Sequence, residues 1–194
     1  FQAEDGIRDT RIGLVGSEMC IRDRDQGIAF EHTLIGDGED REKILSIIKD
    51  LGLAAHTRWL GTQPHEVVRD YYKRAHLFVL GCEVAPNGDR DGIPNVLFES
   101  MAMGVPVVAT ILSAIPELVE TEKTGLLVDP GFPEKMAEAM LRMLTDADLR
   151  TRIIPAARQR VVHDFDNQPL IRDLAAVYRK EIEAFQHVAV SETA

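Results

Sequence analysis

Hydrophobic and polar positions alternate with two different periods from about residue 25 onward. Phe30 to Ile35 has the period-two pattern of a strand, and Asp40 to Leu51 places apolar residues on one side of a helix. The same alternation, punctuated by glycine and proline, continues through the chain. It predicts further strands at 57–60, 77–80, 105–109 and 125–128, and helices at 64–75, 95–103, 115–122, 133–144, 147–163 and 168–187.

Strands that alternate with helices indicate right-handed crossovers and an α/β fold. We therefore expect a doubly wound, Rossmann-like parallel sheet. Ligands bind such sheets beyond the carboxyl ends of the strands. The turn at Gly36–Gly38 and the loop from Gly81 to Asn95 each follow a predicted strand, so both are expected at that edge.

The segment from Asp91 to Glu99 carries the strongest candidate chemistry. Pro94 favours the first turn of a helix, which predicts a helix start between Ile93 and Asn95. The amides of Asn95, Val96 and Leu97 are then expected to be unpaired, and with the helix dipole they favour an anion such as a diphosphate. Glu99, one turn further, is placed to accept hydrogen bonds from sugar hydroxyls. The segment predicts a nucleotide-sugar site.

Asp91, seven intervening residues and Glu99 resemble the Glu-x7-Glu motif of retaining GT-B glycosyltransferases of family 4. The segment from Gly88 to Ala102 is most similar to the exopolysaccharide and colanic-acid branch of that family. Further matches follow in the family's order, at residues 35–38, 58–61, 75–80, 106–109, 115–119 and 125–128. A collinear set is far more specific than one glycine motif. The resemblance, over roughly residues 28 to 180, implies the C-terminal nucleotide-sugar-binding domain of a GT-B enzyme, without the N-terminal domain.

The resemblance also implies a site and a reaction. Asp91 would have the catalytic carboxylate position, where the family normally has Glu, so its reach is shorter by one methylene and full activity is in question. A UDP- or GDP-hexose would be the substrate, with no cofactor and no required metal. The residues expected to bind this sugar donor are Asp91, Gly92, Ile93, Pro94, Asn95, Val96, Glu99, Gly61 and Gly38.

Residues 1–24 differ from the rest of the chain, because they show no sustained period and contain two copies of Ile-Arg-Asp. They resemble translated sequencing-adapter read-through, and a divergent genuine segment is the alternative. We expect a non-native segment at 1–24, the nucleotide-sugar-binding domain at 25–187 and a flexible tail at 188–194. The Arg and Lys with which the family binds the diphosphate, near a Gly-Arg-Leu and a Lys-Gly, are not found in this sequence.

Composition narrows the class of protein. The net charge of −10 argues against a nucleic-acid partner, and two cysteines are too few for a disulfide framework. No run reaches the roughly 18 apolar residues of a membrane span, so membrane contact is not indicated. We expect a cytoplasmic location. Any contact with the inner face of the membrane is expected through the missing half, which would also bind the saccharide or lipid-linked saccharide acceptor.

Three interpretations follow from the sequence. The first is a retaining hexosyltransferase that transfers a sugar to a cell-surface or exopolysaccharide acceptor. The second is a non-catalytic nucleotide-binding fragment without the diphosphate-binding Arg and Lys. The third, a GT-B nucleotide-sugar epimerase, needs an acid/base set that we do not find. The sequence does not identify the base, the sugar, the acceptor, the linkage or the oligomeric state.

Overall fold

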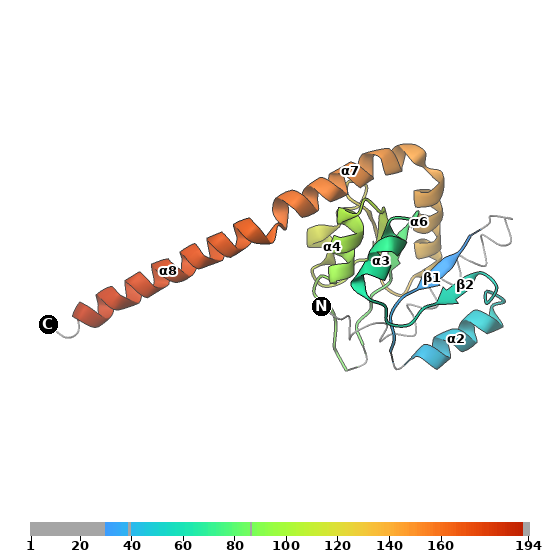
Figure 1. The fold of residues 1–194 in the computed structure, drawn as a ribbon, viewed down its shortest axis with the longest axis horizontal. Helices are drawn as coiled ribbons and strands as arrows, with labels where there is room; N and C mark the ends of the chain where they lie inside the picture. Colours follow the sequence, from blue (N-terminus) through green and yellow to red (C-terminus); the bar gives the residue numbers. More distant parts are fainter. Residues whose placement is uncertain (1–29, 39, 86, 192–194) are drawn as a thin grey trace.

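A computed structural model of the chain describes residues 30–38, 40–85 and 87–191. Helices alternate with short strands, and the long helix α8 projects away from the remainder (Figure 1). The elements are β1 (His32–Leu34), α2 (Arg41–Asp50), β2 (Thr57–Trp59), α3 (His65–Tyr72), β3 (Phe78–Leu80), α4 (Asn95–Ala102), β4 (Val107–Thr110), α5 (Ile115–Leu118), β5 (Leu126–Val128), α6 (Pro133–Thr145), α7 (Ala147–Asp164) and α8 (Asn167–Ser191).

All strand pairs of the described residues are parallel. β1 pairs with β2, with Thr33 opposite Arg58, and β3–β4–β5 form a second group in that order. The predicted α/β fold with parallel strands is therefore confirmed. Within the described part of the chain, no strand joins β1 to β3. Residues 12–16, whose apolar sequence is the one candidate for a strand in the segment 1–24, lie outside the described residues.

Two apolar layers cover the faces of the β3–β4–β5 sheet. Successive residues of β4 point to opposite faces, so Val108 packs with α6 while Val107 and Ala109 pack with α4 and α5. All four residues of β4 are buried. Burial on both faces is the expected property of a central parallel strand and explains its continuous apolar sequence. A smaller core lies between α2 and the first strand pair, built on Ile44, Ile48 and Leu53.

Helix α7 packs against both layers. Leu149 and Ile153, in its first half, belong to the cluster with α6, whereas Ala157 belongs to the cluster with α4. Pro155 lies inside the helix between these two sets. Proline removes one backbone hydrogen bond and favours a bend. Pro155 therefore stands where α7 passes from one layer to the other.

Two predicted boundaries differ from the structure by four residues. Helix α5 ends at Leu118, where the sequence predicted Glu122, and Val119 is already extended. Thr124 accounts for the early end, because its hydroxyl accepts the backbone N–H of Glu120 at 2.7 Å. At the C-terminus, α8 continues to Ser191, four residues into the segment expected to be a flexible tail.

Apolar side chains remain exposed along α8. They recur three or four positions apart, so they form a stripe on the helix. Its members are Leu170, Ile171, Leu174, Val177, Tyr178, Ile182 and Phe185. No helix within the described residues is long and apolar enough to span a membrane.

Candidate functional site

A loop-to-helix junction follows β3 and leads into α4. Pro94 is the residue that precedes the helix, with φ −60° and ψ 132°, and α4 begins at Asn95 as predicted. The Leu97 amide is not free, because it donates to the Pro94 carbonyl at 3.0 Å. The expectation of three unpaired amides is therefore wrong for Leu97, since the first turn closes on its own capping carbonyl. Asn95 and Val96 stay as predicted anion-binding positions.

The C-terminal end of α4 agrees with the helix predicted at 95–103. Gly104 has a φ of +77°, a left-handed conformation that favours glycine, and its N–H donates to the Met101 carbonyl at 3.1 Å. Val105 then donates to Ser100 at 2.9 Å. This turn returns the chain into β4 and fixes the position of α4 on the sheet.

The loop before α4 leaves Asp91 and Gly92 exposed. It folds back on itself, with the Gly88 N–H donating to the Ala85 carbonyl at 2.8 Å and the Ala85 N–H donating to Asp89 at 2.9 Å. A side chain added at Gly92 would meet no atom within 4 Å, and Gly92 does not have a positive φ. Neither backbone conformation nor packing therefore requires glycine at this position.

Glu99 lies on α4 and faces α3. Its Oε2 accepts the hydroxyl of Tyr72 at 3.3 Å, and its Oε1 lies 3.5 Å from Nε2 of His65. The Glu99 side chain is 33% exposed, so one part of the carboxylate is held by the protein and another part reaches solvent. Burial, and then the nearby Glu99 carboxylate, raise the pKa of Tyr72. The hydroxyl therefore stays protonated and acts as a hydrogen-bond donor.

Cys82 lies under the junction. Burial raises the pKa of its thiol to about 12, with a smaller contribution from the charge of Asp91. Its carbonyl accepts a hydrogen bond of 2.7 Å from the Thr110 hydroxyl at the end of β4. A thiol of this kind is a packing group and has little thiolate character near neutral pH.

The loops after β1 and β2 meet each other. The Gly36 N–H donates to the Gly61 carbonyl at 2.9 Å, and Gly61 has a φ of +64°. Gly38 donates to the side chain of Asp37 at 3.0 Å, which is the local hydrogen bond of a turn. Gly38 and Gly61 follow the carboxyl ends of β1 and β2, and this position was predicted for the Gly36–Gly38 turn. The structure joins these two loops to one another, and their part in ligand binding stays a prediction.

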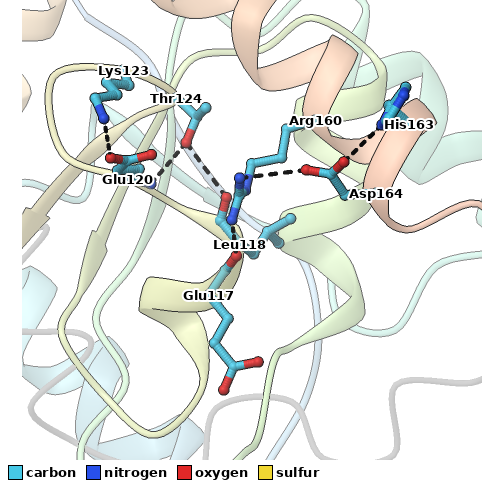
Figure 2. A network of polar contacts seen from close by, with 8 residues as sticks. All are labelled: Glu117, Leu118, Glu120, Lys123, Thr124, Arg160, His163 and Asp164. Atoms are coloured by element: carbon cyan, nitrogen blue, oxygen red, sulfur yellow. Dashed lines mark hydrogen bonds and ion pairs between the residues drawn. The ribbon is translucent and has the colours of Figure 1, made fainter.

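The short helix α5 is held at its C-terminal end by two polar side chains (Figure 2). Arg160 of α7 donates to the Glu117 carbonyl at 2.5 Å, and Thr124 donates to the Leu118 carbonyl at 3.4 Å. The side chain of Glu117 points away from this network. Glu117 lies in the first turn of α5, where an acid favours the helix dipole, so a structural role accounts for it.

A hollow of about 250 Å³ lies on the other side of the sheet, between β5 and α6. Leu126, Lys135 and Arg142 are among its lining residues, and Arg142 forms an ion pair with Glu122 there. None of the lining residues belongs to the junction. Across residues 30–38, 40–85 and 87–191, no group of three or more His, Cys, Asp or Glu side chains is arranged to hold a metal.

Sequence reasoning missed Tyr72 and His65. They lie seven positions apart on α3, about two helical turns, so they share one helix face. Polar groups on one face of a helix are a signal for a polar partner on a neighbouring element. The partner, Glu99, is 27 residues away from Tyr72, and only the packing of α3 against α4 reveals it.

A family model described as "Glycosyl transferases group 1" matches residues 22–160 of this chain. The chain belongs to this family. It is 35% identical over 168 residues to the putative colanic acid biosynthesis glycosyltransferase WcaL of Escherichia coli K12, covering 84% of this chain and 40% of that protein. It is 34% identical to the amylovoran biosynthesis glycosyltransferase AmsK of Erwinia amylovora, covering 86% and 41%. The predicted family and its exopolysaccharide branch are confirmed, and the chain spans about two fifths of these relatives' length.

Solved structures show which domain of a glycosyltransferase this chain resembles. The C-terminal domain of the group 1 glycosyl transferase LpcC from Francisella tularensis superposes with a TM-score of 0.69 at 21% identity, covering 84% of this chain and 83% of that one. Anabaena HepE in complex with UDP-glucose gives 0.67 at 25% identity, covering 83% and 45%. The fold is therefore that of the C-terminal domain of GT-B glycosyltransferases.

Proposed function

We propose that this domain binds the nucleotide-sugar donor of a retaining hexosyltransferase that elongates a cell-surface or exopolysaccharide chain. The donor is a UDP- or GDP-hexose, and its sugar passes to an acceptor hydroxyl that the remaining part of the enzyme binds. The reaction needs no metal or cofactor. The positive end of the α4 dipole and precise positioning at the departing diphosphate then contribute to catalysis.

Within this proposal the residues of the junction bind different parts of the ligand. Asp91 faces the transferred sugar as the catalytic carboxylate, and the Asn95 and Val96 amides, beside Gly92, Ile93 and Pro94, receive the diphosphate. Glu99 accepts hydrogen bonds from the ribose hydroxyls. Gly61 and Gly38 border the nucleotide from the loops that follow β2 and β1.

The observation that carries the proposal is the setting of Glu99. A carboxylate has about four lone-pair positions, and the two α3 side chains engage only part of them. With one third of its side chain exposed, Glu99 can accept the paired hydroxyls of a ribose. The open space beside Gly92 supports the same assignment, because a ligand can approach the backbone closely there.

A second candidate is a nucleotide-binding module without catalytic activity of its own. The sequence carries no recognisable counterpart of the family's diphosphate-binding Arg and Lys, and the chain covers 40% of WcaL. For the 194-residue chain alone we favour nucleotide binding without catalysis. Sugar transfer is then an activity of the whole enzyme.

The test is a calorimetric titration of the chain with UDP and with GDP. We expect weak binding of one of them, and Glu99→Ala should weaken it by about 1–3 kcal/mol, the cost of leaving hydroxyl partners unpaired. Glu66→Ala, at an exposed glutamate of α3, is the matched control and should leave binding unchanged. Equal affinities for the parent chain and Glu99→Ala would refute the role of Glu99.

A further inference from the structure

A clamp on α3 holds the Glu99 carboxylate from two sides. Tyr72, at the C-terminal end of α3, reaches Oε2, and His65, at its first residue, reaches Oε1. Because the two residues share one helix face, they bracket the carboxylate along the helix axis. Such a bracket restricts the side-chain torsions of Glu99 more than a single contact does.

The two members of the clamp differ in rigidity. Tyr72 is buried, and its ring packs edge-on against Phe78 of β3, with 5.8 Å between ring centroids. The His65 side chain is 65% exposed, and its contact to Glu99 is long, at 3.5 Å. Tyr72 is therefore the fixed member, and His65 is a solvent-exposed partner.

The single proton of the Tyr72 hydroxyl has two acceptors within reach. Glu99 Oε2 lies at 3.3 Å and the Val96 carbonyl at 3.4 Å. A charged acceptor makes the stronger hydrogen bond, so the carboxylate is favoured over the carbonyl. Both distances are longer than the usual 2.7–2.8 Å for such a bond. A ligand that draws Glu99 into one position can shorten the contact without moving either helix.

We infer that Tyr72 is a positioning residue for recognition of the nucleotide's ribose, acting through Glu99. It holds Oε2 toward α3 and thereby turns the free lone pairs of the carboxylate toward the vicinal hydroxyls of the ligand. The inference rests on the proposed function, because it assigns to Glu99 the ribose hydroxyls. It adds the residue that sets the geometry of that contact.

A purely structural role for Tyr72, in which it only joins α3 to α4, makes a different prediction. Loss of packing would weaken every nucleotide equally and would lower stability. Loss of positioning would weaken only the ligands that carry ribose hydroxyls. The two roles are separable with ligands that lack these hydroxyls.

The experiment titrates the 194-residue chain with UDP, GDP and their 2′,3′-dideoxy counterparts. We expect the parent chain to prefer the natural nucleotide by about tenfold or more, since the dideoxy compound leaves Glu99 without its partners. Tyr72→Phe keeps the ring and removes the hydroxyl. It should reduce affinity for the natural nucleotide about three- to tenfold and leave affinity for the dideoxy nucleotide unchanged.

Two further variants complete the design. Tyr71→Phe removes the hydroxyl of the neighbouring tyrosine, whose ring lies 4.5 Å from the Arg74 guanidinium, and should change neither affinity. Tyr72→Phe added to Glu99→Ala should have no further effect, because its action passes through Glu99. A thermal melt of each variant checks that the fold is retained.

The outcomes separate the two proposals. A parent chain that binds neither nucleotide, or that binds natural and dideoxy forms equally, overturns the role of Glu99, and the inference on Tyr72 falls with it. A parent chain that discriminates, together with a Tyr72→Phe variant that discriminates equally well, overturns the inference alone. Equal losses for both nucleotide forms assign Tyr72 a structural role only.

Discussion

The hydroxyl of Thr110 donates a 2.7 Å hydrogen bond to the carbonyl of Cys82, and both residues are buried. This bond connects the last residue of β4 to the beginning of the loop that leads to Asp91. It satisfies a carbonyl that lies beyond the end of β3 and so has no strand partner of its own in the β3–β4 register. The position of the candidate site relative to the sheet depends on it.

Replacing Thr110 with Val should therefore lower the free energy of unfolding by about 1–3 kcal/mol, because the Cys82 carbonyl stays buried without its donor. Urea denaturation measures the change. Thr151→Val is the control, since the Thr151 hydroxyl bonds the Ala147 carbonyl at an exposed position of α7. Its effect should stay within about 0.5 kcal/mol. Equal effects at both positions would contradict the assignment.

Two glycines are expected to differ in their tolerance of alanine. A Cβ at Gly125 would lie 2.6 Å from Val119 Cγ1 and 3.0 Å from the Val107 carbonyl, so Gly125→Ala must move the Val119 side chain and crowd β4, and should cost about 2–3 kcal/mol. At Gly61 there is space, but the φ of +64° is unfavourable for alanine, and the cost should be about 1 kcal/mol. Comparison of the two urea midpoints tests the order; a larger loss at Gly61 would refute it.

Gly92 should be required for binding and not for folding. Alanine there meets no protein atom and no positive φ, so the unfolding transition should be unchanged within about 0.5 kcal/mol. If the diphosphate approaches this backbone, the added methyl should weaken nucleotide binding several-fold, measured by calorimetry. Unchanged affinity would remove Gly92 from the proposed site.

The thiol of Cys82 predicts a loss of stability at alkaline pH. Its pKa rises from 9.0 in the unfolded chain to about 12 in the folded protein, so the stabilisation is complete below pH 9 and is lost as the pH rises toward 12. Between pH 9 and pH 10 the loss approaches roughly 1 kcal/mol. Cys82→Ala should lack this component, so urea midpoints of the two proteins should converge as the pH rises. Parallel pH profiles would contradict the prediction.

The segment 1–24 can be tested by deletion. In a doubly wound sheet of order 3-2-1-4-5-6 the first strand is central. Within the described residues no strand joins the β1–β2 pair to the β3–β4–β5 group, and strand edges left open favour association. We therefore expect low stability and association of the chain, and no change in its melt when residues 1–24 are removed. A cooperative melt above about 45 °C that the deletion abolishes would show that the segment is native structure.

Local signals determined most of what the sequence could predict. Pro94 and Gly104 marked the two ends of α4, and the apolar run at 105–109 predicted the strand β4. Contacts between distant residues were not predictable. The early end of α5 depends on the side chain of Thr124, and the amide of Leu97 is paired because Pro94 caps the helix from outside. The clamp of Tyr72 and His65 on Glu99 requires knowledge of how α3 packs on α4.

The path of α7 has a consequence for the way the domain unfolds. One helix contributes Leu149 and Ile153 to one apolar layer and Ala157 to the other, with Pro155 between them. Neither layer can open without detaching a part of the same helix, so the two are coupled into one cooperative unit. Backbone amides of α4 and α6 should then exchange with solvent at similar rates, although these helices cover opposite faces of the sheet.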